Sequence, residues 1–394
     1  MSERLFTPRF IALWSFQLVV FFSAFQLLPA IPFRILELGG SKAAAGSFLF
    51  VYTFASALAA PITGTIADHF GRRRMLILAS VLFIFFSLAY GVIPYIPLLL
   101  AVGVIHGALW SGILSSASAI MAGFIPPSRR TEGLGYWGLA PTVAFSIAPA
   151  VGLAVYRAGG WFWLCVELSV ISVIMAIWAS RLPVVDESRG AELPNLREAW
   201  DWRVIAAALS QTVTAFGYGG ITSYAAILAN ERGIVPDSLY FTVFAVTVIA
   251  VRILTSRVAD RYPPKAMIYF GYVAMPLAYA TLAIAETRVM IAVSATLFGL
   301  GMGIAFPAFM TFVLTYTDER HRARTMGSLI WAFDTGIGIG SLLIGRFGQR
   351  WSLGTAFGIA AALALLAIPI FALTSRRLIR GTDVAPAVEH AGTT

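Results

Sequence analysis

The chain contains little charge and almost no cysteine for its length. Asp, Glu, Lys and Arg make up 12% of its 394 residues, whereas soluble domains carry about 25%. The single cysteine, Cys165, excludes a disulfide framework and cysteine-based metal sites. The sequence also lacks paired catalytic carboxylates, a histidine-rich cluster and a phosphate-cradling Gly-Lys-Ser motif. We therefore expect no enzyme activity, no metal site and no cofactor.

Long apolar runs dominate the sequence, and 59% of the residues are hydrophobic. Runs of about 18 or more apolar residues are typical of membrane-spanning helices. The pattern predicts an all-α membrane protein with twelve transmembrane helices, at 9–36, 44–67, 75–93, 96–125, 134–157, 160–181, 203–230, 237–258, 266–285, 288–316, 324–347 and 351–375. We interpret the first run as an uncleaved span, because it is too long for a signal-peptide core.

The spans fall into two groups of six. We expect a six-helix bundle at 1–181, a polar cytoplasmic linker at 182–202, a second six-helix bundle at 203–375 and a cytoplasmic tail at 376–394. Ser256–Lys265 resembles Gly64–Arg73 at an offset of 192 residues, and other weak matches follow at 192 to 194. The two bundles are therefore predicted to be pseudo-symmetric copies of one unit.

The net charge of +9 comes from basic residues in short loops between apolar runs. These residues favour one side of the membrane by about three to one, which places both termini and the linker in the cytoplasm. We expect a multi-pass protein of the bacterial cytoplasmic (inner) membrane. Its expected partners are the lipid bilayer, a small-molecule substrate and protons. We expect a monomer that binds no nucleic acid.

One loop carries a specific motif, Gly64-Thr-Ile-Ala-Asp68-His-Phe-Gly71-Arg72-Arg73-Arg74. It resembles the signature of the major facilitator superfamily between spans two and three. The matching positions are Gly64, Ala67, Asp68, Gly71, Arg72 and Leu76, while Ile66, His69 and Arg73 depart from the pattern. The resemblance implies the major facilitator fold and similarity to bacterial drug- or sugar-efflux permeases. It also implies that this loop closes the cytoplasmic face in one state of a transport cycle.

A second cytoplasmic latch is expected in the other half. Asp260 repeats the motif carboxylate, and Arg252 lies in an apolar run where an unpaired charge is costly. Asp334, in a later span, is the natural partner, so we expect a cluster of Arg252, Asp260 and Asp334. The alternative is that these charges reach the membrane surface separately.

Two further segments bear on direction and coupling. Pro149 and Gly152 resemble a degenerate exporter motif of the family, although helix packing explains them nearly as well. Many family exporters carry an arginine where this chain has Gly103. His106 follows in the same span and either carries the coupled proton or is a neutral histidine in a helix interface. Asp334 and Glu132 are further proton-coupling candidates, with a surface ion pair as the alternative for Glu132.

The resemblance implies a cavity lined by spans one, four, seven and ten. The candidate lining residues are polar or aromatic, namely Gln17, Gln26, Arg34, His106, Trp110, Gln211, Tyr218 and Phe306. For each, an ordinary interhelical contact is the alternative. Such a lining suits a neutral or mildly amphipathic organic molecule.

These features together predict a secondary active transporter that moves a small amphipathic molecule by proton-coupled efflux through alternating access. An uptake carrier or a lysolipid flippase of the same fold is the alternative. A transport-inactive membrane sensor is the alternative from another class.

Overall fold

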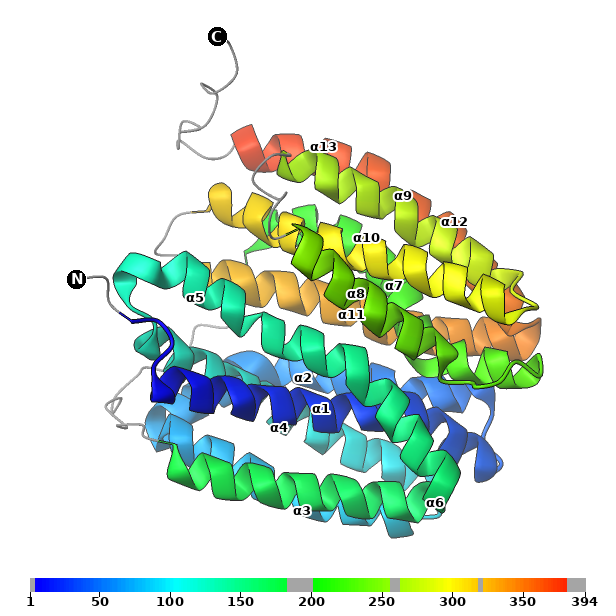
Figure 1. The fold of residues 1–394 in the computed structure, drawn as a ribbon, viewed down its shortest axis with the longest axis horizontal. Coiled ribbons are helices and arrows are strands. Elements are labelled where there is room, and N and C mark those ends of the chain that lie inside the picture. The colour runs from blue at the N-terminus through cyan, green and yellow to red at the C-terminus, as the bar shows by residue number, and fades with distance from the viewer. Residues whose placement is uncertain (1–3, 183–200, 256–262, 318–321, 381–394) are drawn as a thin grey trace.

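The computed structural model describes residues 4–182, 201–255, 263–317 and 322–380, and all regular structure within them is helical (Figure 1). The first half contains α1 (Pro8–Glu37), α2 (Lys42–Phe70), α3 (Arg72–Val92), α4 (Ile96–Phe124), the 3₁₀ turn η1 (Pro127–Arg129), α5 (Arg130–Trp137) and α6 (Leu139–Arg181). The second half contains α7 (Trp202–Glu231), α8 (Leu239–Thr255), α9 (Pro264–Ala283), α10 (Arg288–Thr315), α11 (Arg322–Arg350), α12 (Leu353–Leu365) and α13 (Ala367–Arg380).

The described helices account for the twelve predicted crossings. Ten segments are long and apolar enough to cross a membrane. One of them, Gly135–Arg181, bends at Gly160 and is long enough to cross twice, since 47 residues of helix extend about 70 Å. The shorter apolar helix α8 supplies the remaining crossing. The predicted fold class, an all-α membrane protein of two six-helix bundles, is confirmed.

Three boundaries differ from the sequence-based limits. Gly160 adopts φ 82° and ψ 176°, a non-helical conformation that separates the two predicted spans 134–157 and 160–181, although they meet there without a loop. A separate short helix, α5, precedes α6. The last span is divided at Leu366 into α12 and α13, and α13 continues to Arg380, into the predicted tail. The linker at 182–202 and the rest of the tail lie almost entirely outside the described residues.

The helix starts follow ordinary capping chemistry. The side chains of Thr7, Ser41, Asp201, Thr287 and Ser352 each accept a hydrogen bond from a backbone N–H in the first turn of the helix that follows. The α2–α3 corner turns at Gly71, whose φ of 106° suits glycine. These local signals set where these helices begin and where α2 gives way to α3.

The two halves repeat each other closely in length. α1 and α7 both have 30 residues and begin 194 residues apart, at Pro8 and Trp202. The helices α3 and α9 begin 192 residues apart, as do α4 and α10. In Figure 1, α1 begins and α13 ends at the same end of the bundle, here named the termini end. The other, named the α1–α2 end, holds the α1–α2, α3–α4, α7–α8 and α9–α10 turns.

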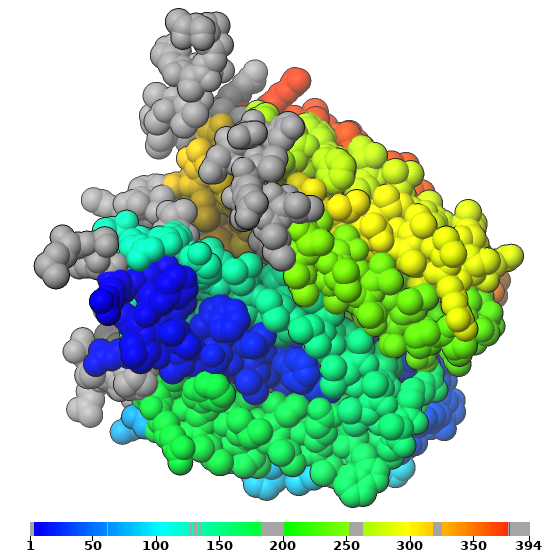
Figure 2. All heavy atoms as spheres, viewed as in Figure 1, coloured from blue at the N-terminus to red at the C-terminus, as the bar shows by residue number. Residues whose placement is uncertain are grey.

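The halves meet mainly where α2 packs against α11 and where α6 packs against α8. Figure 2 shows the face on which α6 and α8 lie against each other. α11 is held tightly between α7 and α2, because glycines face both neighbours. A Cβ added at Gly340 would lie 1.9 Å from the carbonyl oxygen of Phe216 in α7, and one at Gly338 would lie 2.4 Å from Oγ1 of Thr53 in α2.

Because α11 approaches α7 closely, one added methyl group between them should reduce stability strongly. Gly340→Ala should lower the free energy of unfolding by about 1–3 kcal/mol, since the methyl group must displace the α7 backbone. Gly358→Ala in α12 is the matched control, because nothing lies within 4 Å of its added Cβ. Thermal unfolding of both purified variants measures this difference. Equal midpoints for the two variants would contradict the packing account.

Candidate functional site

A continuous band of aromatic rings crosses from one half to the other in the middle of the bundle. In the first half, Phe21 contacts Trp110 and Phe25 at ring-centroid distances of 5.0 and 5.5 Å, and Phe25 contacts Phe145 at 4.7 Å. Phe145 of α6 then contacts Tyr218 of α7 at 5.2 Å. The band thus joins α4, α1 and α6 to the second half.

On the other side of the seam, the band continues into α10 and α11. Tyr218 lies 5.6 Å from Phe298 and 5.9 Å from Phe333, and Phe306 lies 4.9 Å from Phe333. Three predicted cavity residues, Trp110, Tyr218 and Phe306, therefore belong to one aromatic surface that both halves share. The rings pack against one another, and among the described residues no cavity large enough for a water molecule lies beside Tyr218, Phe298 and Phe333, so a flat or apolar molecule would bind here only once the rings move apart.

Asp334 of α11 lies beside this band and is partly buried. Its carboxyl is close enough to the hydroxyls of Tyr218 in α7 and Tyr52 in α2 to interact with them electrostatically. Tyr52 belongs to the opposite half, is 3% exposed, and its hydroxyl has no hydrogen-bond partner within the described ranges. An intramembrane carboxyl at the junction of the halves is a natural proton-binding group.

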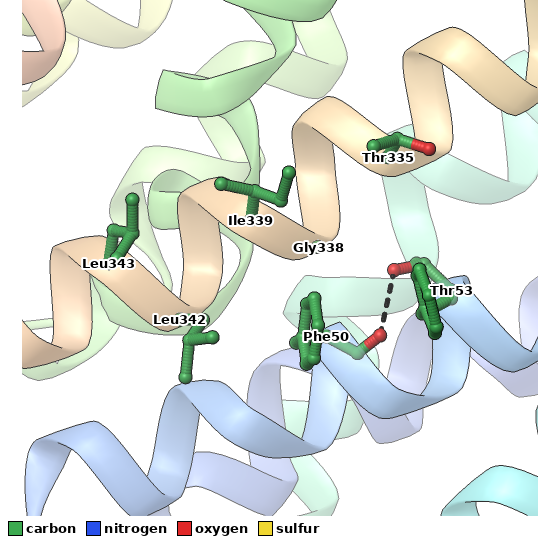
Figure 3. Close-up of a pocket in the computed structure, with 8 residues that line it drawn as sticks. Phe50, Thr53, Thr335, Gly338, Ile339, Leu342 and Leu343 are labelled. Carbon is green, nitrogen blue, oxygen red and sulfur yellow. Dashed lines mark hydrogen bonds between the residues drawn. The ribbon is translucent and has the colours of Figure 1, made fainter.

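A cavity of about 320 Å³ opens between α2 and α11, close to Asp334. It is lined by Phe50, Thr53, Phe54, Thr335, Gly338, Ile339, Leu342 and Leu343. In Figure 3, Phe50 and Thr53 of α2 lie opposite Gly338 and Leu342 of α11, and the Thr53 hydroxyl is turned back to the Phe50 carbonyl. Because the Thr53 hydroxyl donates to backbone carbonyls of its own helix, it leaves the cavity an apolar surface.

The motif loop makes several contacts within the first half. Asp68 pairs with Arg72, with 2.8 Å between Oδ1 and Nε, and Arg73 donates to the backbone oxygen of Ser180 at the end of α6. Gly64 approaches Ser115 of α4 at ordinary contact distance. The loop therefore ties α2, α3 and α6 together at the termini end. Its expected role as a latch between the halves stays a prediction.

The second expected latch is only partly visible. Asp260 and the side chain of Arg252 lie outside the described residues. Asp334 is described, and its recorded electrostatic neighbours are the tyrosines named above. The proposed cluster of the three charges therefore stays a prediction.

His106 lies inside the first bundle, among aromatic rings of α2 and α3. Its Nδ1 is 3.2 Å from the hydroxyl of Tyr90, and its ring lies 4.1 Å from Phe83 and 5.1 Å from Tyr52. The ring is 5% exposed. This environment matches the alternative of a hydrogen-bonded histidine in a helix interface, and Tyr52 connects His106 to Trp110 of the aromatic band, with ring-centroid distances of 5.1 and 6.3 Å.

The glutamines and Arg34 have different surroundings. Gln17 and Gln211 occupy matching positions in α1 and α7, 194 residues apart, and both are 3% exposed. The Gln211 amide oxygen accepts from Thr214 at 3.3 Å. Gln26 is fully buried against Gly152 of α6. Arg34 lies at the α1–α2 end and pairs with Glu37 at 3.4 Å.

Glu132 lies at the termini end, in α5. Arg129 donates to both of its carboxylate oxygens, at 2.7 and 2.8 Å. This hydrogen bonding from Arg129 lowers the pKa of Glu132. An exposed bidentate pair of this kind fits the surface ion-pair alternative. Elsewhere in the described parts of the chain, no group of three His, Cys, Asp or Glu side chains is placed to hold a metal ion.

Sequence reasoning missed the polar contacts that join the halves at the α1–α2 end. Arg157 of α6 donates through Nε to Asp237, which precedes α8, at 2.9 Å. Lys42 at the start of α2 pairs with Glu231 at 2.6 Å, and its carbonyl accepts from Tyr224 at 2.6 Å. We name these two sets of contacts the α6–α8 clasp and the α2–α7 clasp. Their partners are about 80 and 190 residues apart in sequence, so only the fold brings them together.

The α6–α8 clasp gives a testable prediction. Arg157→Asp should loosen the α1–α2 end, because it places two carboxylates against each other where an ion pair stood. Hydrogen–deuterium exchange in 38–45 and 232–240 should then rise. The double variant Arg157→Asp with Asp237→Arg is the matched control and should restore protection. Unchanged exchange in the single variant would show that the pair does not hold this end closed.

Comparisons with known proteins agree with this architecture. The sequence matches the Major Facilitator Superfamily over residues 13–235 and again over 207–390. A bacterial homolog of the human lysosomal transporter Spinster, in an inward-facing and unoccupied conformation, superposes with a TM-score of 0.77 at 16% identity. That match covers 98% of this chain and all of the other. The nucleoside transporter NupG superposes with a TM-score of 0.75 at 13% identity, covering 93% and 99% of the two chains.

Sequence relatives match over shorter segments. The multidrug export protein EmrB of Haemophilus influenzae is 27% identical over 39% of this chain and 31% of its own length. The efflux pump dotC of Dothistroma septosporum is 32% identical over 39% of this chain and 26% of its own length. Multidrug resistance protein 2 of Bacillus subtilis is 23% identical over 46% of each chain. The chain thus spans less than half the length of these relatives. Because the family match extends over nearly the whole sequence, the chain belongs to the Major Facilitator Superfamily, a family of membrane transporters and not of enzymes.

Proposed function

We propose that this protein is a proton-coupled efflux transporter for small amphipathic organic molecules, working by alternating access. The observation that carries the proposal is the aromatic band shared by both halves, with a partly buried carboxyl, Asp334, beside it. Rings from both halves can hold an apolar molecule only while the halves stay together around it. Rocking of the halves would then change which side of the membrane the band faces.

The clasps support a state closed at the α1–α2 end. Both join the halves there, and Ser341 of α11 donates to the Gly46 carbonyl of α2 at 3.0 Å a little deeper in the bundle. With the termini in the cytoplasm, as the distribution of basic residues favours, this state is closed to the outside and ready to take substrate from within. Opening the clasps and closing the termini end would release the substrate outside.

Asp334 is the proposed coupling group, and Tyr52 is the group that responds to its charge. A carboxylate here attracts a hydroxyl donor strongly, whereas a protonated carboxyl does so less. Because Tyr52 belongs to α2 and Asp334 to α11, their attraction pulls the two halves together. Protonation of Asp334 would thus weaken one contact across the seam and allow the halves to rock.

Names of sequence relatives support export, since EmrB, dotC and the Bacillus subtilis protein are all described as export, efflux or resistance proteins. An uptake carrier and a lysolipid flippase are the competing functions within the same fold. The apolar cavity between α2 and α11 favours the flippase over the uptake carrier, because an acyl chain could lie there.

Direction of transport is tested in cells with ethidium as an amphipathic probe. Efflux predicts that expression lowers ethidium accumulation and that a protonophore abolishes the difference. Higher accumulation on expression would indicate uptake. The same measurement with a fluorescent lysophospholipid tests the flippase. If neither probe shows an effect in cells that contain the folded protein, a transport-inactive membrane sensor is favoured.

The coupling role of Asp334 is tested in proteoliposomes. Asp334→Asn should lower ethidium transport driven by a pH gradient by about tenfold or more, because the amide binds no proton. Ethidium exchange without a gradient should continue, since the aromatic band is intact. Asp201→Asn is the matched control, because asparagine also caps a helix and position 201 lies outside the spans. Equal gradient-driven transport in both variants would rule out Asp334 as the coupling group.

A further inference from the structure

A second carboxyl lies within the membrane-spanning part of the chain, in the distal half of α6. Glu167 follows the bend at Gly160 by seven residues, which places it about 10 Å along the helix from the α1–α2 end. Its neighbours in the sequence are apolar, and Trp163 and Val170, one turn away on either side, are exposed on the outer surface of the helix. Figure 2 shows this part of α6, in green, lying along α1, in blue.

Glu167 is partly exposed at the edge of the contact between α6 and α1, and one side of its carboxyl faces α1. Its Oε2 atom is buried, and the group lies next to the amide of Gln26. Gln26 itself is fully buried. In the described parts of the chain, neither the amide oxygen and nitrogen of Gln26 nor Oε2 of Glu167 has a partner with hydrogen-bond geometry. One oxygen of a carboxyl and the amide of Gln26 therefore lie next to each other beside apolar side chains.

A bare carboxylate in this interface is costly, because neither lipid nor the apolar side chains solvate it. An amide is a suitable neighbour for both forms of the acid. Its N–H donates to the carboxylate, and after an amide rotation its oxygen accepts from the protonated carboxyl. Glu167 can therefore gain or lose a proton while keeping one hydrogen bond to Gln26.

Other ionisable groups surround the pair from three helices. Arg34 and Glu37 lie further along α1, Tyr90 lies in α3, and Tyr156, Arg157 and Cys165 lie in α6. Arg34 and Tyr90 are both close enough to Cys165 to interact with it electrostatically. Tyr156 donates to Glu37, which also pairs with Arg34. Arg34 and Glu37 thus engage each other, and Gln26 remains the polar group beside Glu167.

We propose that Glu167 is a second proton-binding residue of this transporter, with Gln26 as its hydrogen-bond partner. The inference rests on the proposed proton coupling and extends it to the first half of the molecule. A proton at Glu167 changes how α6 is held to α1. The same two helices carry Arg34, Glu37, Tyr156 and Arg157 at their α1–α2 ends, so protonation at Glu167 acts on the α6–α8 clasp.

Infrared difference spectra of the purified full-length protein in lipid test this inference. Between about pH 5 and about pH 9, the unmodified protein should show a carbonyl band of a protonated carboxyl that Glu167→Gln lacks. Glu286→Gln, at an exposed acid outside the spans, is the matched control and should retain the band. In Gln26→Leu the band should persist to higher pH, because the carboxylate loses its donor. Glu167→Asp should restore a band if the glutamine variant folds poorly.

A band that is the same in Glu167→Gln and in the unmodified protein would overturn the inference. So would a Gln26→Leu spectrum with an unchanged pH midpoint, since Gln26 would then not be the partner. These outcomes are separate from the failure of the proposed function. If a pH gradient drives no probe but the Glu167 band is present, the proton site stands and coupled efflux does not.

Discussion

The contact on which the rest of the structure depends is the packing of α11 between α7 and α2. In a bilayer the hydrophobic effect does not press helices together, so close backbone approach and polar contacts must do so. Gly336 and Gly340 let α11 meet the α7 backbone, and Gly338 lets it meet α2 of the other half. α11 is thus bound firmly to its own bundle and also forms a seam with the opposite bundle. That position makes a charge on α11, such as Asp334, able to influence both halves.

The distribution of polar groups suits an interface between the two halves that opens and closes. Ion pairs join the halves at the α1–α2 end, where water can solvate them when they separate. In the middle, aromatic rings join the halves, and such contacts can slide or re-form with little cost. Among the described residues, the carboxyls within the spans lie near neutral polar groups: Asp334 near Tyr52 and Tyr218, and Glu167 near the Gln26 amide. Neutral partners allow a carboxyl to change its protonation, whereas a close arginine would keep it charged.

The sequence predicted the fold well and the site only in part. Membrane spans follow from local apolar runs, so ten of the twelve predicted crossings match separate described segments closely, and the motif loop indicated the family. The two spans predicted at 134–157 and 160–181 meet at the non-helical Gly160, and the lack of a loop between them was not foreseen because apolar runs do not show how two spans are joined. The family resemblance supplied the cavity-lining spans, and the structure places three of the predicted lining residues, Trp110, Tyr218 and Phe306, along one band of rings, while their role in binding stays a prediction. His106 and Gln26 were also predicted to line the cavity; the structure places both at helix interfaces of the first half, which a sequence does not show, and their role in binding stays a prediction. The two clasps could not be predicted, because a sequence does not show which distant residues the fold brings together.

The central claim is that the two ends of the bundle open in alternation and that protons drive the exchange. Its most direct test is to measure two distances between spin labels by double electron–electron resonance. One pair of labels replaces Tyr95 and Ile284 at the α1–α2 end, and the other replaces Phe70 and Trp202 at the termini end. All four positions are exposed, and each pair joins the two halves. Lowering the pH, which protonates Asp334, should lengthen the Tyr95–Ile284 distance and shorten the Phe70–Trp202 distance. Asp334→Asn should abolish both changes. Two distances that rise and fall together, or that ignore pH, would contradict the claim.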